Sequence, residues 1–450
     1  MKKLVIIGGG ISGLAAAWKA SRSGAETDVT LIERDERLGG KILTDAIDGF
    51  LLEQGPDSFL TTRPEALQLC RELGIADGLI PRTPRKSHSF IMHGHALFPL
   101  PEGFSGMVPT DSAALAASPL LSEAGKKRVR ENGDLLAGTG KDDESVASFM
   151  IRRWGEEAFQ LLVEPLVGGI HAGDARLLSR EAIVPPPRRT TEPGAGTGPP
   201  FLTFTKGTTE LVRALERRLT GITILRGAAA ESITRRGRGY VIEVSGGEER
   251  VADALIIATP AHEAARLLAP LDAGMQEMLG LIPFASTIVI HLAYRRADIA
   301  HPLDGYGYLI PSVEGSDLVA CTWSSQKWEG RAPRDHVLLR LMAGRFGRRD
   351  LRGRAAPEIF KIARDELSAT MGITAAPLLQ QLHWWDRGMP QYTVGHVRRV
   401  EAINERAARF PGLFLAGSSY RGVGIPQCVE SGVRAASSAL GHFAKQGVHS

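Results

Sequence analysis

The stretch LVIIGGGISGLAAAWKA, residues 4–20, joins a run of apolar residues to three glycines and then to a helix of small residues. Gly8, Gly10 and Gly13 fit the pattern G-x-G-x-x-G between a strand and a helix. The first glycine permits a tight turn, the second lets a pyrophosphate approach the backbone, and the third lets helix and strand pack closely. The helix N-terminus then faces the phosphates. With the next apolar run, DVTLIER at 28–34, the pattern predicts a βαβ unit that binds a dinucleotide.

A carboxylate follows at the spacing that such a unit requires. Glu33 comes twenty residues after Gly13 and ends the second expected strand. A carboxylate in this place accepts hydrogen bonds from ribose hydroxyls. The alternative is a purely structural glycine turn with a glutamate on the surface.

The sequence just after Glu33 distinguishes FAD from NAD. The sequence RLGGK at 37–41 resembles the corresponding loop of large FAD-dependent oxidases and desaturases. Its glycines let the loop lie against the flavin's phosphate–ribityl arm, and its cations offset phosphate charge. LIIATP (255–260) and FLAGSSYRGVGIPQCVESGVRAA (414–436) resemble, in turn, the strand behind the cofactor and the second flavin contact of such proteins. These resemblances imply FAD as the cofactor.

Composition sets wider limits. The chain has 450 residues, and its formal net charge of +4 comes from cations spread along the sequence. This pattern disfavours a nucleic-acid partner and suits an anionic substrate or a membrane surface. Cys70, Cys321 and Cys428 are far apart, which predicts neither a disulfide nor a thiol metal site and favours a reducing cytoplasm. An immediate N-terminal strand leaves no room for a signal peptide, and segment 281–294 is too short and polar for a membrane span.

Strand-like and helix-like segments predict an α/β fold with a discontinuous Rossmann-like FAD-binding domain, an α+β substrate domain and a helical insertion. We expect the FAD-binding domain at 1–80, 204–264 and 386–450, the substrate domain at 81–95 and 265–385, and the helical domain at 96–203. The stretch 185–200 is rich in Pro, Gly and Thr and predicts a mobile surface loop.

Five further segments carry a more specific resemblance. They are GFLLEQGPDSFL (49–60), VEPLVGGIHAGD (163–174), ACTWSSQKW (320–328), WDRGMPQYTVGH (385–396) and GVGIPQC (422–428). With these segments the chain resembles the porphyrinogen oxidases of haem synthesis over essentially its whole length, and most closely the soluble bacterial type that acts on coproporphyrinogen III. The resemblance implies a six-electron oxidation with oxygen as acceptor and hydrogen peroxide as product, and a helical domain that touches the membrane.

The motifs and the resemblance together assign the cofactor site. Its expected residues are Gly8, Gly9, Gly10, Ile11, Ser12, Gly13, Glu33, Arg34, Gly39, Gly40, Lys41, Gly55, Pro56, Asp57, Ser58, Ala230, Trp385, Val423, Gly424 and Ile425. The resemblance places Gly55–Ser58 on the flavin ring region. It gives the backbone of Ala230 the task of binding adenine, although relatives usually have a bulkier β-branched residue there. No side chain is assigned as catalytic, because flavin N5 carries the chemistry.

The expected substrate is a large apolar tetrapyrrole with carboxylate tails, so its site should combine aliphatic walls with a few cations. By the resemblance, Arg63 anchors a propionate and Leu309 and Leu341 lie in strands that line the cleft. The alternatives are a solvated arginine at a helix start and ordinary core packing. His171 stands where relatives often have an aromatic residue; it either contacts the substrate or, as we favour, is an ordinary buried histidine.

Several alternatives stay open at this point. Protoporphyrinogen IX has two propionates where coproporphyrinogen III has four, and the sequence does not show which cations of the substrate region face the ligand: Arg295, Arg296, Lys327, Arg331, Arg340 and Arg345. A flavin amine oxidase is disfavoured because no Cys stands beside Tyr420. A carotenoid desaturase is equally disfavoured, and the intact glycine pattern argues against a cofactor-free binding module. His93 and His95 share a face of an expected strand but lack a third ligand, so we predict no metal.

We expect porphyrinogen and oxygen as small-molecule partners. Transient contact with other enzymes of haem synthesis and peripheral contact with a membrane are left open.

Overall fold

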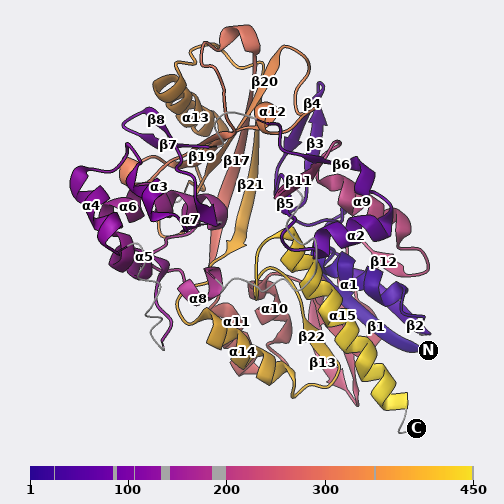
Figure 1. Cartoon of the computed structure of the whole chain (residues 1–450). Helices are drawn as coiled ribbons and strands as arrows, with labels where there is room; N and C mark the ends of the chain where they lie inside the picture. The colour runs from indigo at the N-terminus through magenta and orange to yellow at the C-terminus, as the bar shows by residue number, and fades with distance from the viewer. Residues whose placement is uncertain are drawn as a thin grey trace.

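A computed structural model describes residues 1–24, 26–84, 89–105, 107–132, 142–184, 199–348 and 351–447. Two large sheets organise the chain, with a group of helices beside one of them (Figure 1). Most of the expected mobile loop at 185–200 lies outside the described residues.

A five-stranded parallel sheet, in the order β12-β2-β1-β16-β22, holds the glycine turn. Its strands are β1 (Lys2–Ile7), β2 (Thr27–Ile32), β12 (Thr223–Leu225), β16 (Ala254–Ile257) and β22 (Leu413–Leu415). They come from the beginning, the middle and the end of the chain. Both faces of β1 are buried, Leu4 and Ile6 on one side and Val5 and Ile7 on the other, as is usual in parallel sheets.

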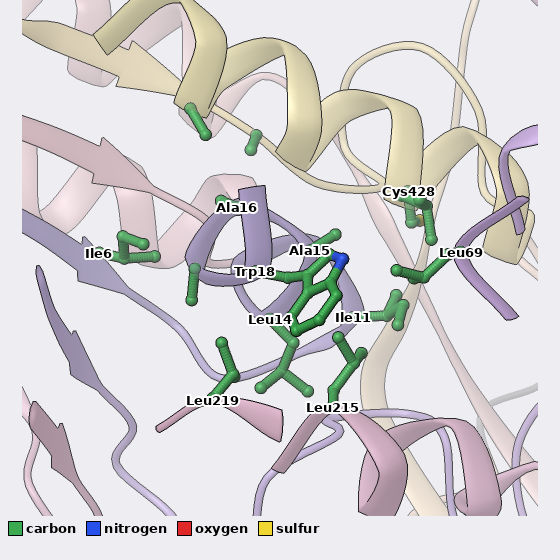
Figure 2. Packing of buried hydrophobic residues seen from close by; sticks show 14 of the residues in the cluster. Ile6, Ile11, Leu14, Ala15, Ala16, Trp18, Leu69, Leu215, Leu219 and Cys428 are labelled. Carbon is green, nitrogen blue, oxygen red and sulfur yellow. The ribbon is translucent and has the colours of Figure 1, made fainter. Parts of the chain in front are cut away.

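Helices cover both faces of this sheet (Figure 1). Four helices cover one face: α1 (Ile11–Ser21), α2 (Glu65–Leu73), α9 (Thr209–Arg218) and α15 (Ile425–Gly447). The other face is covered by three helices, α10 (Ala261–Leu268), α11 (Ala273–Gly280) and α14 (His396–Ala407). A small antiparallel sheet of β13 (Ala230–Arg236), β14 (Gly239–Val244) and β15 (Glu248–Ala252) packs on this second face as well. Figure 2 shows Trp18 of α1 packed among the apolar side chains of the first of these faces, including Leu14, Leu215 and Leu219.

A seven-stranded sheet, in the order β21-β17-β20-β19-β18-β7-β8, forms the second body. Its strands are β7 (Phe90–His93), β8 (Ala96–Pro99), β17 (Phe284–Arg295), β18 (Gly307–Leu309), β19 (Leu318–Trp323), β20 (His336–Ala343) and β21 (Leu379–Pro390). Helix α13 (Ala356–Met371) packs on one face through Ile359 and Leu367. The short helix α12 (Ser324–Lys327) follows β19.

Helices beside the seven-stranded sheet form a third group, at the left of Figure 1. They are α3 (Ser112–Ala116), α4 (Glu123–Asn132), α5 (Val146–Trp154), α6 (Glu156–Ala158), α7 (Glu164–His171) and α8 (Arg180–Ile183), with a π-helical turn at Phe159–Val163 before α7. In the part of the chain that the structure describes, no helix combines the length and the apolar character needed to cross a membrane.

Short strands complete the fold. They are β3 (Thr44–Ile47), β4 (Phe50–Glu53), β5 (Phe59–Leu60), β6 (Leu79–Pro81), β9 (Phe104–Ser105), β10 (Val108–Pro109) and β11 (Phe201–Phe204), with 3₁₀ turns at Ala76–Gly78, Arg296–Asp298 and Ser312–Glu314.

Three of the expected domain edges fall within paired strand structure. The edges at 203 and 385 lie inside β11 and β21, and the edge at 95 lies in the turn between β7 and β8. The division into domains stays a prediction, with these edges moved to the ends of the strands.

Candidate active site

The glycine turn after β1 is packed so closely that side chains are excluded at two positions. Gly8 has φ +108°, and a Cβ on Gly13 would lie 1.8 Å from the carbonyl oxygen of Gly8. Gly10 differs, because no heavy atom lies within 4 Å of the place its Cβ would take. It is also the N-cap of α1, without a side-chain cap, so the backbone there stays open to a ligand. The first turn of α1 contains Ile11, Ser12 and Gly13.

Glu33, at the end of β2, is buried and fixed by backbone donors. Its Oε2 accepts a hydrogen bond of 2.6 Å from the amide of Gly9, and its Oε1 accepts one of 2.9 Å from the amide of Asp35. Each carboxylate oxygen can accept more than one hydrogen bond, so this geometry is compatible with a ribose contact. The next residue, Arg34, is exposed and lies 3.8 Å from Glu263.

The expected adenine region lies beside Glu33. The amide of Glu33 donates a hydrogen bond to the carbonyl of Leu225 (2.8 Å), and its carbonyl accepts one from the amide of Ala228 (3.0 Å). Ala230 begins β13 two residues later, and its carbonyl accepts a hydrogen bond of 2.9 Å from Nη2 of Arg266. That carbonyl keeps a second lone pair for a ligand.

The RLGGK loop lies directly on the glycine turn. The amide of Gly39 donates to the carbonyl of Gly9 at 2.8 Å, and a Cβ on Gly40 would lie 3.2 Å from the Cα of Gly10. The chain then continues to Lys41, whose pKa is lowered by its desolvated surroundings. A Cβ on Gly55 would lie 1.8 Å from the carbonyl oxygen of Lys41. The three glycine segments therefore form one continuous backbone cradle.

The segment around Gly55 is attached to the seven-stranded sheet. Nε1 of Trp385 donates to the carbonyl of Gln54 at 2.6 Å, and Nη2 of Arg340 donates to the carbonyl of Gly55 at 2.6 Å. Pro56 stands between Gly55 and Asp57 in the same segment. The expected ring region therefore lies at the junction of the two sheets.

The side chain of Asp57 is used inside the protein rather than left open to a ligand. Its Oδ2 accepts hydrogen bonds from Nζ of Lys327 (2.8 Å) and Nε1 of Trp328 (3.1 Å), and its Oδ1 accepts one from the hydroxyl of Ser58 (2.8 Å). Burial alone would raise the pKa of Asp57, but Lys327 and Arg340 outweigh burial and hold that pKa well below its usual range. A cofactor contact at Asp57 and Ser58 is therefore left mainly to their backbone.

The C-terminal glycine segment contacts Tyr392 and the helical group. The amide of Gly422, at φ +131°, donates to the hydroxyl of Tyr392 at 2.8 Å. Val423 packs against the helical group, Gly424 follows it, and α15 begins at Ile425.

Helix α15 crosses α1 at Gly432, where a Cβ would lie 2.0 Å from the carbonyl oxygen of Ser12. Sequence reasoning missed Gly432, although it stands in a run of small residues, SGVRAASSAL. This close crossing brings the two ends of the chain into one site.

Leu309 and Leu341 do not share a face of the sheet. Leu309 packs against α7, with its Cδ2 at 2.8 Å from the place a Cβ on Gly169 would take. Leu341 is fully buried under α13 on the opposite face. The expectation that Leu341 lines the cleft is therefore wrong for this arrangement.

Met342, the residue after Leu341, projects to the face of the sheet that Leu309 occupies. Leu309 pairs with Ala320, Ala320 pairs with Met342, and Met342 pairs with Val289, so these four residues form one row across the sheet. Directly paired residues project to the same face. Met342 is partly exposed, and sequence reasoning missed it.

Arg63 and His171 are placed as follows. Nη1 of Arg63 lies 3.8 Å from Oε2 of Glu430 on α15, and the Arg63 side chain is one-fifth exposed (21%).

His171 ends α7 and is buried, which lowers its pKa to about 4 and keeps it neutral at pH 7. Burial is compatible with both readings of His171, and its role stays a prediction.

Most of the expected substrate cations are engaged within the protein. Lys327 pairs with Asp57, Arg331 with Glu53 and Arg345 with Glu164, while Arg340 holds the carbonyl of Gly55. Arg296 donates to backbone carbonyls and Arg295 is exposed. Within the described ranges no group of three His, Cys, Asp or Glu side chains could hold a metal ion. Nδ1 of His93 lies 2.6 Å from Glu314, and His95 is in the β7–β8 turn.

Comparison with known proteins decides the family. The model for "Flavin containing amine oxidoreductase" matches residues 11–440. The chain belongs to this family. Membership of this family makes the chain an FAD-dependent oxidoreductase with a mixed α/β fold, and it confirms the predicted cofactor, fold class and enzyme class.

Relatives within the family are more specific. The chain is 32% identical to coproporphyrinogen III oxidase of Bacillus subtilis (strain 168), over 98% of each chain. It is 31% identical to protoporphyrinogen oxidase of Bos taurus, again over 98% of each chain. A crystal structure provisionally described as a protoporphyrinogen oxidase from Exiguobacterium sp. 255-15 matches with a TM-score of 0.85 and 30% identity, over 97% of this chain and 98% of that one. These matches confirm the resemblance to porphyrinogen oxidases.

Proposed function

We propose that this flavin-containing oxidoreductase oxidises coproporphyrinogen III to coproporphyrin III in haem synthesis, with oxygen as acceptor and hydrogen peroxide as product. The observation that carries the proposal is the full-length similarity to coproporphyrinogen III oxidase, in a chain that also has a continuous glycine cradle. The role proposed for each part of the chain follows from where its residues lie.

The glycine turn and α1 would hold the pyrophosphate of FAD, and Glu33 would bind its ribose. The loop at 39–41 would lie along the phosphate–ribityl arm of FAD, in the direction of Gly55. FAD, when bound, supplies a two-electron hydride acceptor at N5. Leu309 and Met342, the partly exposed members of the row Leu309–Ala320–Met342–Val289, would give the tetrapyrrole an apolar wall that orients it and excludes water. The six-electron oxidation removes three hydrides from meso carbons in three rounds, each with one oxygen reduced to hydrogen peroxide. The three balancing protons, two from pyrrole N–H groups and one from the fourth meso carbon, leave to water, so no side chain is assigned as a general base.

A comparison of the two porphyrinogens tests the substrate. With each supplied at equal concentration and with oxygen present, we expect turnover of coproporphyrinogen III to exceed that of protoporphyrinogen IX several-fold. Porphyrin fluorescence measures the porphyrin formed, and a peroxide assay measures the hydrogen peroxide formed from oxygen. A preference for protoporphyrinogen IX would reject the proposed substrate in favour of the activity named for the bovine relative.

Arg63→Ala is expected to raise KM for coproporphyrinogen III several-fold and to leave FAD content unchanged. The reason is that Arg63 would hold a propionate in the ground state, and loss of such an anchor appears mainly in KM. Glu430 lies 3.8 Å away and competes for the charge, so Glu430→Gln is expected to lower KM. Steady-state kinetics and flavin absorbance measure both effects. Loss of flavin from Arg63→Ala would show that the residue serves the cofactor instead.

We also propose peripheral contact with a membrane through two exposed apolar side chains that lie side by side, Leu177 and Val394. These side chains are exposed, and the amide of Val394 donates to the carbonyl of Leu177 at 3.0 Å. Leu177→Ser with Val394→Ser is expected to reduce co-sedimentation with anionic phospholipid vesicles several-fold. Leu378→Ser, at another exposed leucine, is the control. Equal binding by all variants would contradict this contact. Contact with other enzymes of haem synthesis remains a prediction.

A further inference from the structure

Five charged side chains gather beneath the segment that contains Gly55. Two are carboxylates of that segment, Glu53 and Asp57, and three are cations from the region of the seven-stranded sheet, Lys327, Arg331 and Arg340. We call these five residues the Arg340 cluster. Glu53, Arg331 and Arg340 are almost completely buried, and Asp57 and Lys327 are largely buried.

The Arg340 cluster carries an excess of positive charge. Three cations face two carboxylates, and burial is the largest influence on Glu53, whose pKa is raised. The two carboxylates therefore carry at most two negative charges, one fewer than the three positive charges of the cations. Arg82 adds a further cation within electrostatic range of Asp57. Charges act more strongly on one another here than at the surface, because little water is present to screen them.

This excess charge lies at one end of the backbone cradle. Arg340 donates to the carbonyl of Gly55 at 2.6 Å, and Gly55 packs on the carbonyl of Lys41. The cradle runs from Lys41 through Gly40 to Gly10, where the pyrophosphate is expected. The Arg340 cluster is therefore at the opposite end from the phosphates, on the side where the flavin ring is expected.

We propose that the Arg340 cluster raises the reduction potential of the bound flavin, because its excess positive charge favours the negative charge that the ring gains on reduction. The inference rests on the placement of FAD in the proposed function. Arg340 and Asp57 act here as positioning residues, through charge and through Gly55, and are not assigned to the reaction itself.

Two substitutions of opposite charge test the proposal in the flavin-loaded protein without porphyrinogen. Arg340→Met removes a positive charge and is expected to lower the midpoint potential. Asp57→Asn removes a negative charge with little change of shape and is expected to raise it. A spectroelectrochemical titration of the flavin absorbance measures both shifts. A purely structural role would move both potentials in the same direction, or neither, since both substitutions break hydrogen bonds around the same segment.

Matched controls separate charge from structure. Arg334→Gln loses the same unit charge at a side chain that is 96% exposed, and its potential is expected to equal that of the unaltered protein. Arg340→Lys keeps the charge and is expected to stay closer to the unaltered value than Arg340→Met. If Arg340→Met retains no flavin, Lys327→Met takes its place as the variant expected to lower the potential.

Shifts of equal sign, or shifts no larger than that of Arg334→Gln, would overturn the proposal. Opposite shifts in a protein that turns over neither porphyrinogen would uphold the role of the Arg340 cluster and reject the proposed substrate.

Discussion

Gly10→Ala is expected to weaken FAD binding while the protein keeps its fold. The backbone of Gly10 has φ −69° and ψ 176°, which alanine adopts freely, and apart from Gly10 and its two chain neighbours no protein atom lies within 4 Å of the added Cβ. The Cβ instead enters the space through which the pyrophosphate approaches the backbone. Loss of one hydrogen bond to a charged group costs about 1.5–3 kcal/mol, so we expect FAD to bind at least about tenfold more weakly. Titration of the apoprotein with FAD measures the change.

Gly441→Ala is the matched control. Gly441 lies within α15, also with no atom within 4 Å of its Cβ position. Alanine there should leave FAD affinity unchanged and stabilise the protein by about 0.5–1 kcal/mol, as expected in a helix interior. Unchanged FAD affinity in Gly10→Ala would show that the cofactor does not pass over this turn.

Arg331→Met is expected to destabilise the protein by about 3–5 kcal/mol, the usual cost of leaving a buried charge without its partner. Arg331 is 1% exposed, and its Nη2 lies 3.4 Å from Oε1 of Glu53 and donates to Phe204 at 3.0 Å. Its removal leaves Glu53 with hydrogen bonds from Thr208 and Thr44 but without a cation in contact. A shift of the urea unfolding midpoint measures the loss.

A second substitution identifies the cause. Glu53→Gln removes the uncompensated charge and can still accept a hydrogen bond from Thr208, so the double variant should be more stable than Arg331→Met alone. Strictly additive losses would show that the two side chains act independently.

Features that depend on a few neighbouring residues were predictable from the sequence. The roles of Gly8, Gly10 and Gly13 follow from spacing alone, and the structure gives each one the packing that its role requires. Glu33 was predicted from its distance along the chain, but not its hydrogen bond with the amide of Gly9. The FAD assignment and the porphyrinogen oxidase family came from resemblance and not from physical reasoning.

Features that depend on distant residues were not predictable. Lys327 was expected among the substrate cations, but it pairs with Asp57, which is 270 positions away in the sequence. Leu341 was expected at the substrate because the sequence alone does not show to which face of the sheet each residue of β20 projects. A bulge between Leu318 and Ala320 shifts the pairing of β19 with β20, so the face of Met342 cannot be read from spacing.

The most direct test is the flavin content of the purified full-length chain. We expect a yellow protein with a flavin absorption band, from which acid releases about one FAD per chain, in keeping with one glycine cradle of this type. The apoprotein should recover the band when FAD is added back. A colourless protein that takes up no added FAD would contradict the cradle formed by the two ends of the chain, and with it the proposed oxidation.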